Sequence, residues 1–270
     1  MLARLSAVLL VATLISACAV SPTGRRQLSL VSEESAIAAS KEAYLAQMNE
    51  LGTAGKLVTD PAVVGRVDRI TSRLVAQAVM LRPETAKWEW SVEVIDDPMT
   101  VNAWCMAGGR MAVYTGLILE IKPTDDELAQ VMGHEISHAL ANHTAERMSV
   151  AMATQAGVAA AGVFSKDNAG LVMGAAALAA QYAIQLPNSR VAESEADEIG
   201  IQLAAKAGYN PNAAATLWEK MGTVGGAGPP QFMSTHPSPT NRQQKLRELA
   251  PQMMPFYQAA RNPPSYPISR

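Results

Sequence analysis

"VMGHEISHALANH", residues Val131–His143, holds three of the four histidines of this 270-residue chain. His134 and His138 are four residues apart, so on a helix they lie about 40° apart around the axis and one turn apart along it. Both imidazoles can then reach one metal ion. His143 falls on the opposite face of such a helix, where we expect a solvated or capping histidine. The stretch therefore predicts a helix that presents two metal ligands, His134 and His138, on one side.

Glu135 is next to His134, where its carboxylate can approach a water on the ion rather than the ion itself. This is the HExxH arrangement, here written HEISH. Two neutral imidazoles leave a zinc ion electrophilic, and the ion makes its water acidic. The carboxylate can take the proton of that water and pass it to a leaving amine. The motif predicts zinc-dependent peptide hydrolysis with Glu135 as the general base.

The residues before the histidines predict how this helix begins and what packs beside it. Thr124-Asp125-Asp126-Glu127 is a capping box, which marks a helix start. From Trp88 to Val94 apolar and polar residues alternate, as in a strand with one buried face. Two further short apolar runs meet at Gly108-Gly109, as two strands joined by a β-turn. We expect an α+β fold, mostly helical, with a small antiparallel sheet packed beside the HExxH helix.

Other stretches also favour helices. Asp60 before Pro61 is typical of a helix start, and apolar residues follow it on one stripe. The alanine-rich stretch 148–186 predicts two close-packed helices, each short for a membrane span. The helices expected besides the histidine helix are 32–49, one from Asp60-Pro61, two within 148–186, 190–206 with Gly208 as its C-cap, one from Asn210-Pro211 and a last one ending near Ala250.

A catalytic zinc ion needs a third protein ligand and an open fourth position. The metzincin spacing would place a histidine six residues after His138, but Thr144 stands there. In "RVAESEADEIG" only Glu193 and Asp197 form an i, i+4 pair of acidic residues on one helix face. We expect Glu193 to bind the metal and Asp197 to accept a hydrogen bond from the outer N–H of a ligating histidine. The alternative for this stretch is a solvated acidic face.

The first residues resemble an export signal, with Arg4 ahead of an apolar stretch, residues 5–15, that is too short to span a bilayer. Two cleavage sites compete. Ala17-Cys18-Ala19 fits ordinary signal peptidase, whereas "ISAC" resembles the lipobox of bacterial lipoproteins. The lipobox is favoured, and it predicts acyl chains on Cys18 that anchor the protein to a membrane facing the periplasm.

The charge balance and the cysteine content narrow the classes of partner and of cysteine chemistry that we expect. The 22 Lys and Arg residues are offset by 24 Asp and Glu residues, and no basic run exceeds Arg25-Arg26, which argues against nucleic acid. With Cys18 lipidated, Cys105 has no disulfide partner and is expected to be a buried apolar residue rather than a nucleophile. The expected organisation is a signal peptide at 1–17, a tether at 18–30, a peptidase domain at 31–250 and a disordered, Pro-rich tail at 251–270.

"HEISHALANH", "ESEAD" and "THPSPTNR" together resemble the HtpX-like and CAAX-prenyl-protease-like family of membrane-associated zinc metallopeptidases. The similarity covers residues from about 25 to 249 and includes the layout of bacterial periplasmic lipoprotein peptidases of the LoiP and BepA type. It implies a gluzincin-type fold, one zinc ion held by His134, His138 and Glu193, and Glu135 as the general base.

The resemblance also implies a role for the fourth histidine, His236. In such members the histidine of the THP segment, here His236, can occupy the fourth zinc position and displace the water that hydrolysis needs. As such a plug, His236 lowers activity, so its loss raises turnover. As a transition-state donor, it is required for turnover. Arg242 is a further candidate for oxyanion stabilisation, and its alternative is a surface salt bridge.

Zinc peptidases of this kind hold an extended peptide against a sheet edge. Asn102, Ala103 and Trp104 are the candidate edge strand, which would bind backbone groups with little sequence choice. The resemblance implies protein substrates, misfolded or membrane-associated, in the bacterial periplasm. It also implies the outer-membrane assembly machinery as a partner. Ala19 after Cys18, in place of Asp, resembles outer-membrane sorting in enteric bacteria and favours an anchor in the inner leaflet of the outer membrane, with the inner membrane as the alternative. The alternatives are a zinc-stabilised, non-catalytic chaperone or assembly factor and a lipoprotein that binds no metal.

Overall fold

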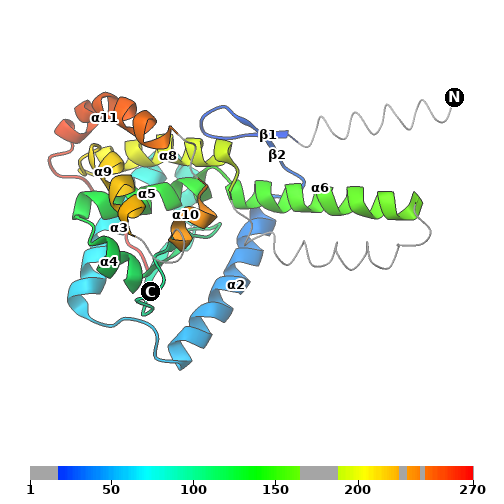
Figure 1. The fold of residues 1–270 in the computed structure, drawn as a ribbon, viewed down its shortest axis with the longest axis horizontal. Helices are drawn as coiled ribbons and strands as arrows, with labels where there is room; N and C mark the ends of the chain where they lie inside the picture. The colour runs from blue at the N-terminus through cyan, green and yellow to red at the C-terminus, as the bar shows by residue number, and fades with distance from the viewer. Residues whose placement is uncertain (1–17, 165–187, 225–229, 238–240, 270) are drawn as a thin grey trace. The chain divides into compact units, whose positions relative to one another are not determined.

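The computed structural model describes residues 18–164, 188–224, 230–237 and 241–269. The chain forms two compact units, one from residues 1–36 and 142–186 and the other from residues 37–141 and 187–270. The fold is α+β and mostly helical, as expected (Figure 1). The elements of the larger unit are the main part of α2 (Glu33–Thr53), α3 (Pro61–Leu81), η1 (Pro83–Lys87), β3 (Ser91–Ile95), β4 (Ala103–Cys105), β5 (Arg110–Tyr114), α4 (Thr115–Ile121), α5 (Asp125–Leu140), α8 (Arg190–Lys206), α9 (Ala213–Thr223), α10 (Gln231–Thr235) and α11 (Arg242–Ala259).

α5, the histidine helix, is the centre of the larger unit. It begins at the predicted capping box, because the Glu127 N–H donates to the Thr124 hydroxyl at 3.2 Å and the Thr124 N–H donates to the Glu127 carboxylate at 2.8 Å. Every residue from Glu127 to Leu140 is buried. A helix buried all round needs neighbours on every side, and α3, α8, α9 and β4 pack against α5.

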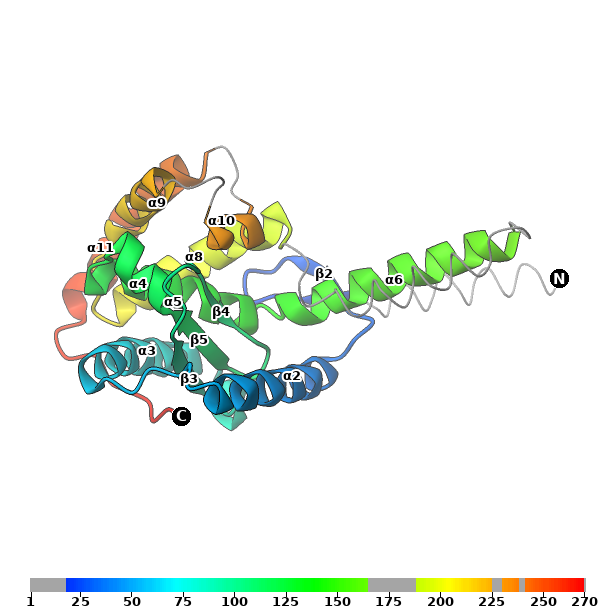
Figure 2. The same ribbon diagram turned by 60° about the horizontal axis from the view of Figure 1, so that its bottom comes forward.

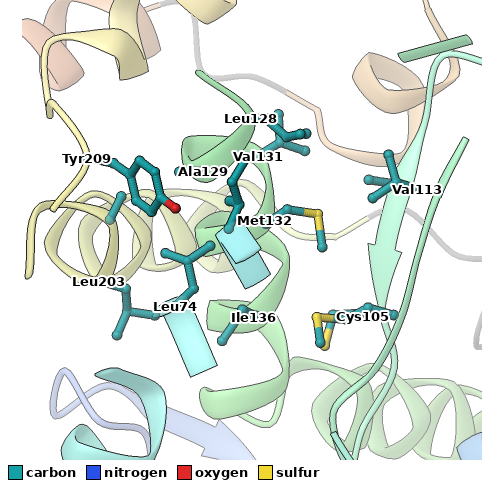
Figure 3. Close-up of a cluster of buried hydrophobic side chains, with 14 of the residues drawn as sticks. Leu74, Cys105, Val113, Leu128, Ala129, Val131, Met132, Ile136, Leu203 and Tyr209 are labelled. Atoms are coloured by element: carbon teal, nitrogen blue, oxygen red, sulfur yellow. The ribbon is translucent and has the colours of Figure 1, made fainter. Parts of the chain in front are cut away.

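The core holds α5 between helices and strands. Figure 3 shows side chains of α5 between those of α3 and α8 on one side and those of the strands on the other. Close packing of this kind leaves a buried helix little freedom to shift. The residues that show this arrangement are Val131, Met132 and Ile136 of α5, Leu74 of α3, Leu203 of α8, and Cys105 and Val113 of the strands.

α5 and α8 cross at two glycines. A Cβ atom on Gly133 would lie 2.9 Å from the Gly200 carbonyl oxygen, and one on Gly200 would lie 2.9 Å from the His134 backbone nitrogen. Any side chain at either position would therefore force the helix backbones apart. The crossing brings the first turns of α8, with their acidic residues, next to the histidines of α5.

The sheet of the larger unit is mixed, which corrects the expectation of an antiparallel sheet. β4 and β5 form the predicted antiparallel hairpin through Gly108-Gly109, but β3 pairs with β5 in parallel. The strand order is β3-β5-β4, so β5 lies in the middle and β4 at an edge (Figure 2). Alternation of residues predicts a strand, whereas the direction of its neighbour depends on the path by which the chain returns.

The strand expected at 88–94 is observed as β3, Ser91–Ile95, and both of its faces are largely buried. Tyr44 of α2 covers one face, with its hydroxyl 3.5 Å from the Ser91 hydroxyl. Val92 and Val94 belong to the hydrophobic core on the other face. The expectation of a single buried face is therefore wrong, because α2 covers the side on which the polar residues lie.

The C-terminal residues also differ from the expectation. The last helix, α11, ends at Ala259 rather than near Ala250 and contains two prolines. A proline removes one hydrogen bond from a helix, and here contacts outside the helix compensate, as the ring of Phe256 packs against Lys206 of α8. Residues 260–269 are not a disordered tail, since the N–H groups of Tyr266 and Ser269 donate to carbonyl oxygens of Ser72 and Trp90.

The smaller unit contains β1 (Cys18–Val20), β2 (Arg26–Leu28), the start of α2 and α6 (His143–Phe164). β1 and β2 pair antiparallel, so part of the expected tether, residues 18–30, forms a short hairpin, and its role as a tether stays a prediction. The Arg25 guanidinium makes two hydrogen bonds to the Glu146 carboxylate, at 2.6 and 2.7 Å, which tie this hairpin to α6. His143 is 1% exposed, so the expectation of a solvated histidine is wrong.

α6 is the first of the two helices expected within 148–186, and it starts earlier, at His143. The second falls mostly within residues 165–187, outside the described residues, as does the export signal at 1–17. Among the helices that the structure describes, none has the combination of length and hydropathy needed to cross a membrane.

Candidate metal centre

Four buried side chains of the larger unit converge on one point. His134 and His138 come from α5, Glu193 from the first turn of α8, and His236 follows α10 directly. None of the four is more than 5% exposed. One ligand atom from each lies within 4.8 Å of the others. The structure thus brings together the three predicted metal ligands and the predicted fourth one.

The spacing of the ligand atoms fits a single ion. With metal–ligand bonds of about 2.1 Å, tetrahedral geometry requires neighbouring ligand atoms about 3.4 Å apart. His134 Nε2 lies 3.0 Å from His138 Nε2 and 3.2 Å from His236 Nδ1. Glu193 oxygens lie 3.2 Å from His134 Nε2 and 3.4 Å from His138 Nε2. Three imidazoles and a carboxylate at this spacing have the geometry to hold one metal ion.

Asp197 lies on the outer side of the first histidine, as predicted. Its Oδ1 atom is 3.0 Å from His134 Nδ1, the ring nitrogen that points away from the other ligands. A carboxylate in this position accepts a hydrogen bond from the Nδ1–H group. The proton then stays on Nδ1, and the Nε2 lone pair is available to a metal ion. The i, i+4 spacing on α8 explains how one helix supplies both carboxylates, Glu193 and Asp197.

Arg242, the first residue of α11, joins these two carboxylates. Its guanidinium lies 3.2 Å from Glu193 Oε2 and 2.5 Å from Asp197 Oδ1. It also lies over the ring of Trp218, 3.7 Å from the ring centroid. Because Arg242 is only 2% exposed, the alternative of a surface salt bridge is wrong. The arginine instead neutralises buried negative charge beside the metal ligands.

The charges of the centre shift one another's pKa values. Burial and Arg242 lower the pKa of His134, but hydrogen bonds to Asp197 and Glu193 outweigh them and raise it to about 9. Burial raises the pKa of Glu193, but hydrogen bonds to His134 and His138 lower it far below its usual range. The Glu193 carboxylate is therefore ionised in a buried site, where a bound cation would stabilise it further.

Glu135 and His236 are in contact within the centre. Glu135 is 2% exposed, and its Oε1 atom lies 3.4 Å from His236 Nε2. The other ring nitrogen of His236 lies 3.0 Å from Glu193 Oε1. The imidazole thus stands between the candidate base and the ligand carboxylate.

Cys105 is buried, as expected. Burial and the charge of Glu135 raise the pKa of Cys105 well above its usual value, which fits an apolar core cysteine.

The candidate substrate strand lies beside the HExxH helix. β4 contains Ala103 and Trp104, and Asn102 precedes it directly. β4 packs against α5 and pairs with β5 on one side only, as far as the described residues extend. β4 is therefore an edge strand of the described sheet, as expected, and peptide binding there stays a prediction. Cys18 begins β1 in the smaller unit, and its lipidation likewise stays a prediction.

Sequence reasoning missed three residues of this centre. Asn188 lies just before α8, with Nδ2 3.4 Å from His138 Nε2. The ring of Phe232 stacks on the His236 imidazole, and Trp218 packs against Arg242. Phe232 is four residues before His236, a spacing that could have suggested contact on one helix. For Asn188 and Trp218 the sequence carries no local signal, because only the fold places them here.

The chain is similar to known metallopeptidases. The family model described as "Peptidase family M48" matches residues 61–250. The chain is 34% identical over 234 residues to the mitochondrial metalloendopeptidase OMA1 of Schizosaccharomyces pombe, covering 85% of this chain and 65% of that protein. It is 31% identical to the human metalloendopeptidase OMA1, covering 91% of this chain and 48% of that protein.

A bacterial protein is also similar. The β-barrel assembly-enhancing protease of Escherichia coli is 28% identical over 217 residues, covering 77% of this chain and 43% of that protein. The chain thus spans between 43% and 65% of the length of these three relatives. The family match extends over more than half of the chain and includes all the residues of the metal centre. The chain belongs to peptidase family M48.

Proposed function

We propose that the protein is a zinc-dependent metalloendopeptidase of the bacterial periplasm that cleaves misfolded or membrane-associated proteins. The observation that carries this proposal is the buried cluster of His134, His138 and Glu193 with Glu135 beside it. A site that only stabilises the fold needs ligands, whereas a hydrolytic site also needs a base. Family membership supports the same reaction class.

His134, His138 and Glu193 would hold the ion, and Asp197 would orient His134. Zinc held there supplies Lewis-acid chemistry at the scissile carbonyl and lowers the pKa of a water. Glu135 takes the proton of the attacking water on a carboxylate oxygen and then delivers it to the nitrogen of the leaving amine. This division of tasks assigns each acidic side chain of the centre a separate role.

Arg242 holds Glu193 and Asp197 in place, and its predicted role in oxyanion stabilisation stays a prediction. Its guanidinium makes hydrogen bonds to both carboxylates and is stacked on Trp218. These contacts use both terminal nitrogens of the guanidinium, and they account for its position beside the ligand carboxylate. We therefore propose that Arg242 keeps the ligand carboxylate ionised and fixed.

His236 is proposed to be a plug that occupies the fourth ligand position until substrate binds. Its Nδ1 atom lies among the other ligand atoms, 3.2 Å from His134 Nε2 and 3.0 Å from Glu193 Oε1. Its Nε2 atom contacts Glu135, so the ring occupies space that an attacking water needs. His236→Ala should therefore raise turnover several-fold. Loss of all turnover in this variant would instead make His236 a transition-state donor.

The compartment and the substrates are argued from the chain's N-terminus and from its relatives. The lipobox predicts a lipid anchor at Cys18, and Ala19 in place of Asp after it favours the inner leaflet of the outer membrane. The name of the Escherichia coli relative links it to β-barrel assembly, which supports outer-membrane proteins as substrates and the assembly machinery as a partner. The OMA1 relatives are mitochondrial, so the periplasmic assignment depends on the export signal.

Cleavage of unfolded casein by purified protein tests the proposal. We expect zinc-loaded wild type to cleave casein and Glu135→Gln to lose at least about 1,000-fold in rate while still binding zinc, because the general base is gone. A chelator should abolish the wild-type activity. Glu198→Gln is the matched control, since Glu198 is exposed on α8 and lies outside the centre. Full activity of Glu135→Gln would refute the proposal.

A non-catalytic assembly factor is the second candidate, and one observation favours it. Four protein ligands around one point are typical of a structural zinc site, and His236 completes such a set. The two candidates differ in what Glu135 does. If Glu135→Gln supports normal outer-membrane assembly in cells as well as wild type does, the structural role is correct. If the variant fails although it folds and binds zinc, hydrolysis is the function.

A further inference from the structure

The short helix α10 contacts both the candidate substrate edge and the candidate metal centre. The backbone N–H of Phe232, its second residue, donates to the Val101 carbonyl oxygen at 3.1 Å, just before β4. The Phe232 carbonyl oxygen accepts a hydrogen bond from the His236 N–H at 3.0 Å. A single backbone path of five residues therefore connects the edge strand to the fourth ligand.

The register of β4 shows which of its backbone groups are free to bind a peptide. The Asn102 carbonyl oxygen accepts from the Tyr114 N–H, so the backbone groups of Asn102 face β5. Because these groups alternate in direction along a strand, those of Val101 and Ala103 face outward. A peptide that adds to this edge must pair with the outward groups.

The first outward groups already have partners within the chain. The Val101 carbonyl oxygen accepts from the Phe232 N–H, as described above, and the Ala103 N–H donates to Asn102 Oδ1 at 3.0 Å. An incoming strand must displace these partners to reach the edge. Displacing the Asn102 side chain changes only a local contact, whereas displacing the Phe232 N–H removes an anchor of α10.

The side chain of Phe232 also holds the histidine. Its ring is stacked on the His236 imidazole, with centroids 4.5 Å apart and planes 22° apart. Phe232 is 1% exposed and also packs against Trp218, 5.8 Å between centroids. Phe232 is the only residue of α10 that is fully buried. Phe232 therefore helps to set the position of His236, together with the Asn188 N–H, which donates to the Thr235 carbonyl oxygen at 3.2 Å.

We propose that α10 links peptide binding at the β4 edge to the release of His236. Pairing of an extended peptide with Val101 displaces the Phe232 N–H, and the imidazole then leaves its place between Glu135 and Glu193. The inference rests on the proposed function, in which His236 is a plug. Phe232 acts on the centre through His236 and is a positioning residue rather than a catalytic one.

Linkage makes the idea quantitative. Suppose that peptide binding shifts the equilibrium for His236 release by a given factor. A protein in which His236 is already released must then bind the peptide more tightly by that factor. Loss of a stacked aromatic pair shifts such an equilibrium about three- to tenfold. Phe232→Leu keeps the N–H and an apolar side chain but removes the stacked ring. It should therefore strengthen peptide binding about three- to tenfold, and His236→Ala should do so at least as much.

The experiment uses the full chain in a Glu135→Gln background, which prevents cleavage, with Co²⁺ in place of zinc. The visible absorption of Co²⁺ depends on its coordination number, geometry and ligand types, so replacement of an imidazole by water changes it. The probe is a fluorescein-labelled, unfolded casein fragment. Phe256→Leu on α11 is the matched control, because it makes the same change at a half-exposed ring away from the centre.

We expect the casein fragment to change the Co²⁺ spectrum of the parent protein towards that of the His236→Ala protein. Phe232→Leu should show part of that change without the fragment and bind the fragment more tightly, whereas Phe256→Leu should match the parent. Should Phe232→Leu fail to fold, the affinity of His236→Ala still decides, because linkage requires it to bind the fragment more tightly.

A Co²⁺ spectrum that does not change when the fragment binds would overturn the coupling. So would an affinity for the fragment equal to that of the parent protein in both the His236→Ala and the Phe232→Leu proteins. In either case the proposed function would stand as long as the protein with Glu135 intact cleaves casein. A protein that binds neither Co²⁺ nor zinc would refute the proposed function itself, and the coupling with it.

Discussion

The metal centre combines two regions of different construction. His134, His138 and Glu193 lie on α5 and α8, helices of 16 and 17 residues whose backbones touch at their crossing. His236 follows α10, a helix of five residues with a single buried side chain. Long packed helices hold ligands rigidly, whereas a short helix with few contacts opens at little cost. We infer that three ligands are permanent and that the fourth is exchangeable.

The largest effect that distinguishes the two regions is on metal affinity. Glu193→Gln removes an ionised ligand and leaves Arg242 with less compensating charge, so zinc affinity should fall by more than about 100-fold, beyond the range for residues behind a ligand. His236→Ala should lower zinc affinity much less, because three ligands remain. Competition with a chromogenic chelator measures both, with Glu198→Gln as the control. Equal losses in the two variants would remove the distinction between permanent and exchangeable ligands.

Asp197→Asn tests the support behind the permanent ligands. The amide is nearly isosteric but carries no charge, so it holds the His134 Nδ1–H less well and no longer pairs with Arg242 as an ion. Zinc affinity should fall about 10- to 100-fold, as is usual for residues that orient a ligating histidine. The same chelator competition measures it. Wild-type affinity would mean that packing alone orients the His134 ring.

Gly200→Ala tests the helix crossing. The new Cβ atom would meet the His134 backbone nitrogen at 2.9 Å, so α5 and α8 must separate, and the free energy of unfolding should fall by about 1–3 kcal/mol. Gly222→Ala on α9 is the control. No atom lies within 4 Å of its Cβ position, so this change should leave stability equal or slightly higher. Denaturant unfolding compares the two. A stable Gly200→Ala protein would show that the crossing is adaptable.

The smallest effect concerns the start of α5. Burial raises the pKa of Glu127, but hydrogen bonds from Lys220, the Thr124 N–H and the Thr216 hydroxyl outweigh it, so its pKa lies below the usual value. A lowered pKa stabilises the fold above the pKa of the unfolded chain, and this stabilisation is lost as the pH falls through the folded pKa.

Glu127→Gln should therefore unfold more easily than wild type at pH 7, by about 1 kcal/mol, and the difference should shrink as the pH falls below about 4. Urea unfolding at several pH values measures this, with Glu120→Gln on the exposed face of α4 as the control. A difference that stays constant from pH 7 to pH 3 would show that charge does not contribute to this cap.

The sequence predicted the permanent part of the centre better than the exchangeable part. His134, His138, Asp197 and Glu193 follow from helical spacing within two short stretches, and the structure places all four together. Arg242 was predicted from the sequence as a site residue, with a surface salt bridge as the alternative. That alternative is wrong, since Arg242 is buried beside Trp218. Phe232 was not found at all, although its spacing from His236 could have suggested a contact, and its link to Val101 is visible only in the folded chain.

Local sequence patterns set where α5 begins, which of its residues share a face and which acidic pair of α8 can contact them. These are local properties, set by the capping box at Thr124–Glu127 and by the helical period. The tertiary structure decided that β3 lies parallel to β5, that Gly133 meets Gly200 and that Phe232 joins the edge strand to His236. Such contacts join segments far apart in the chain, and only the packing of the whole core selects among them.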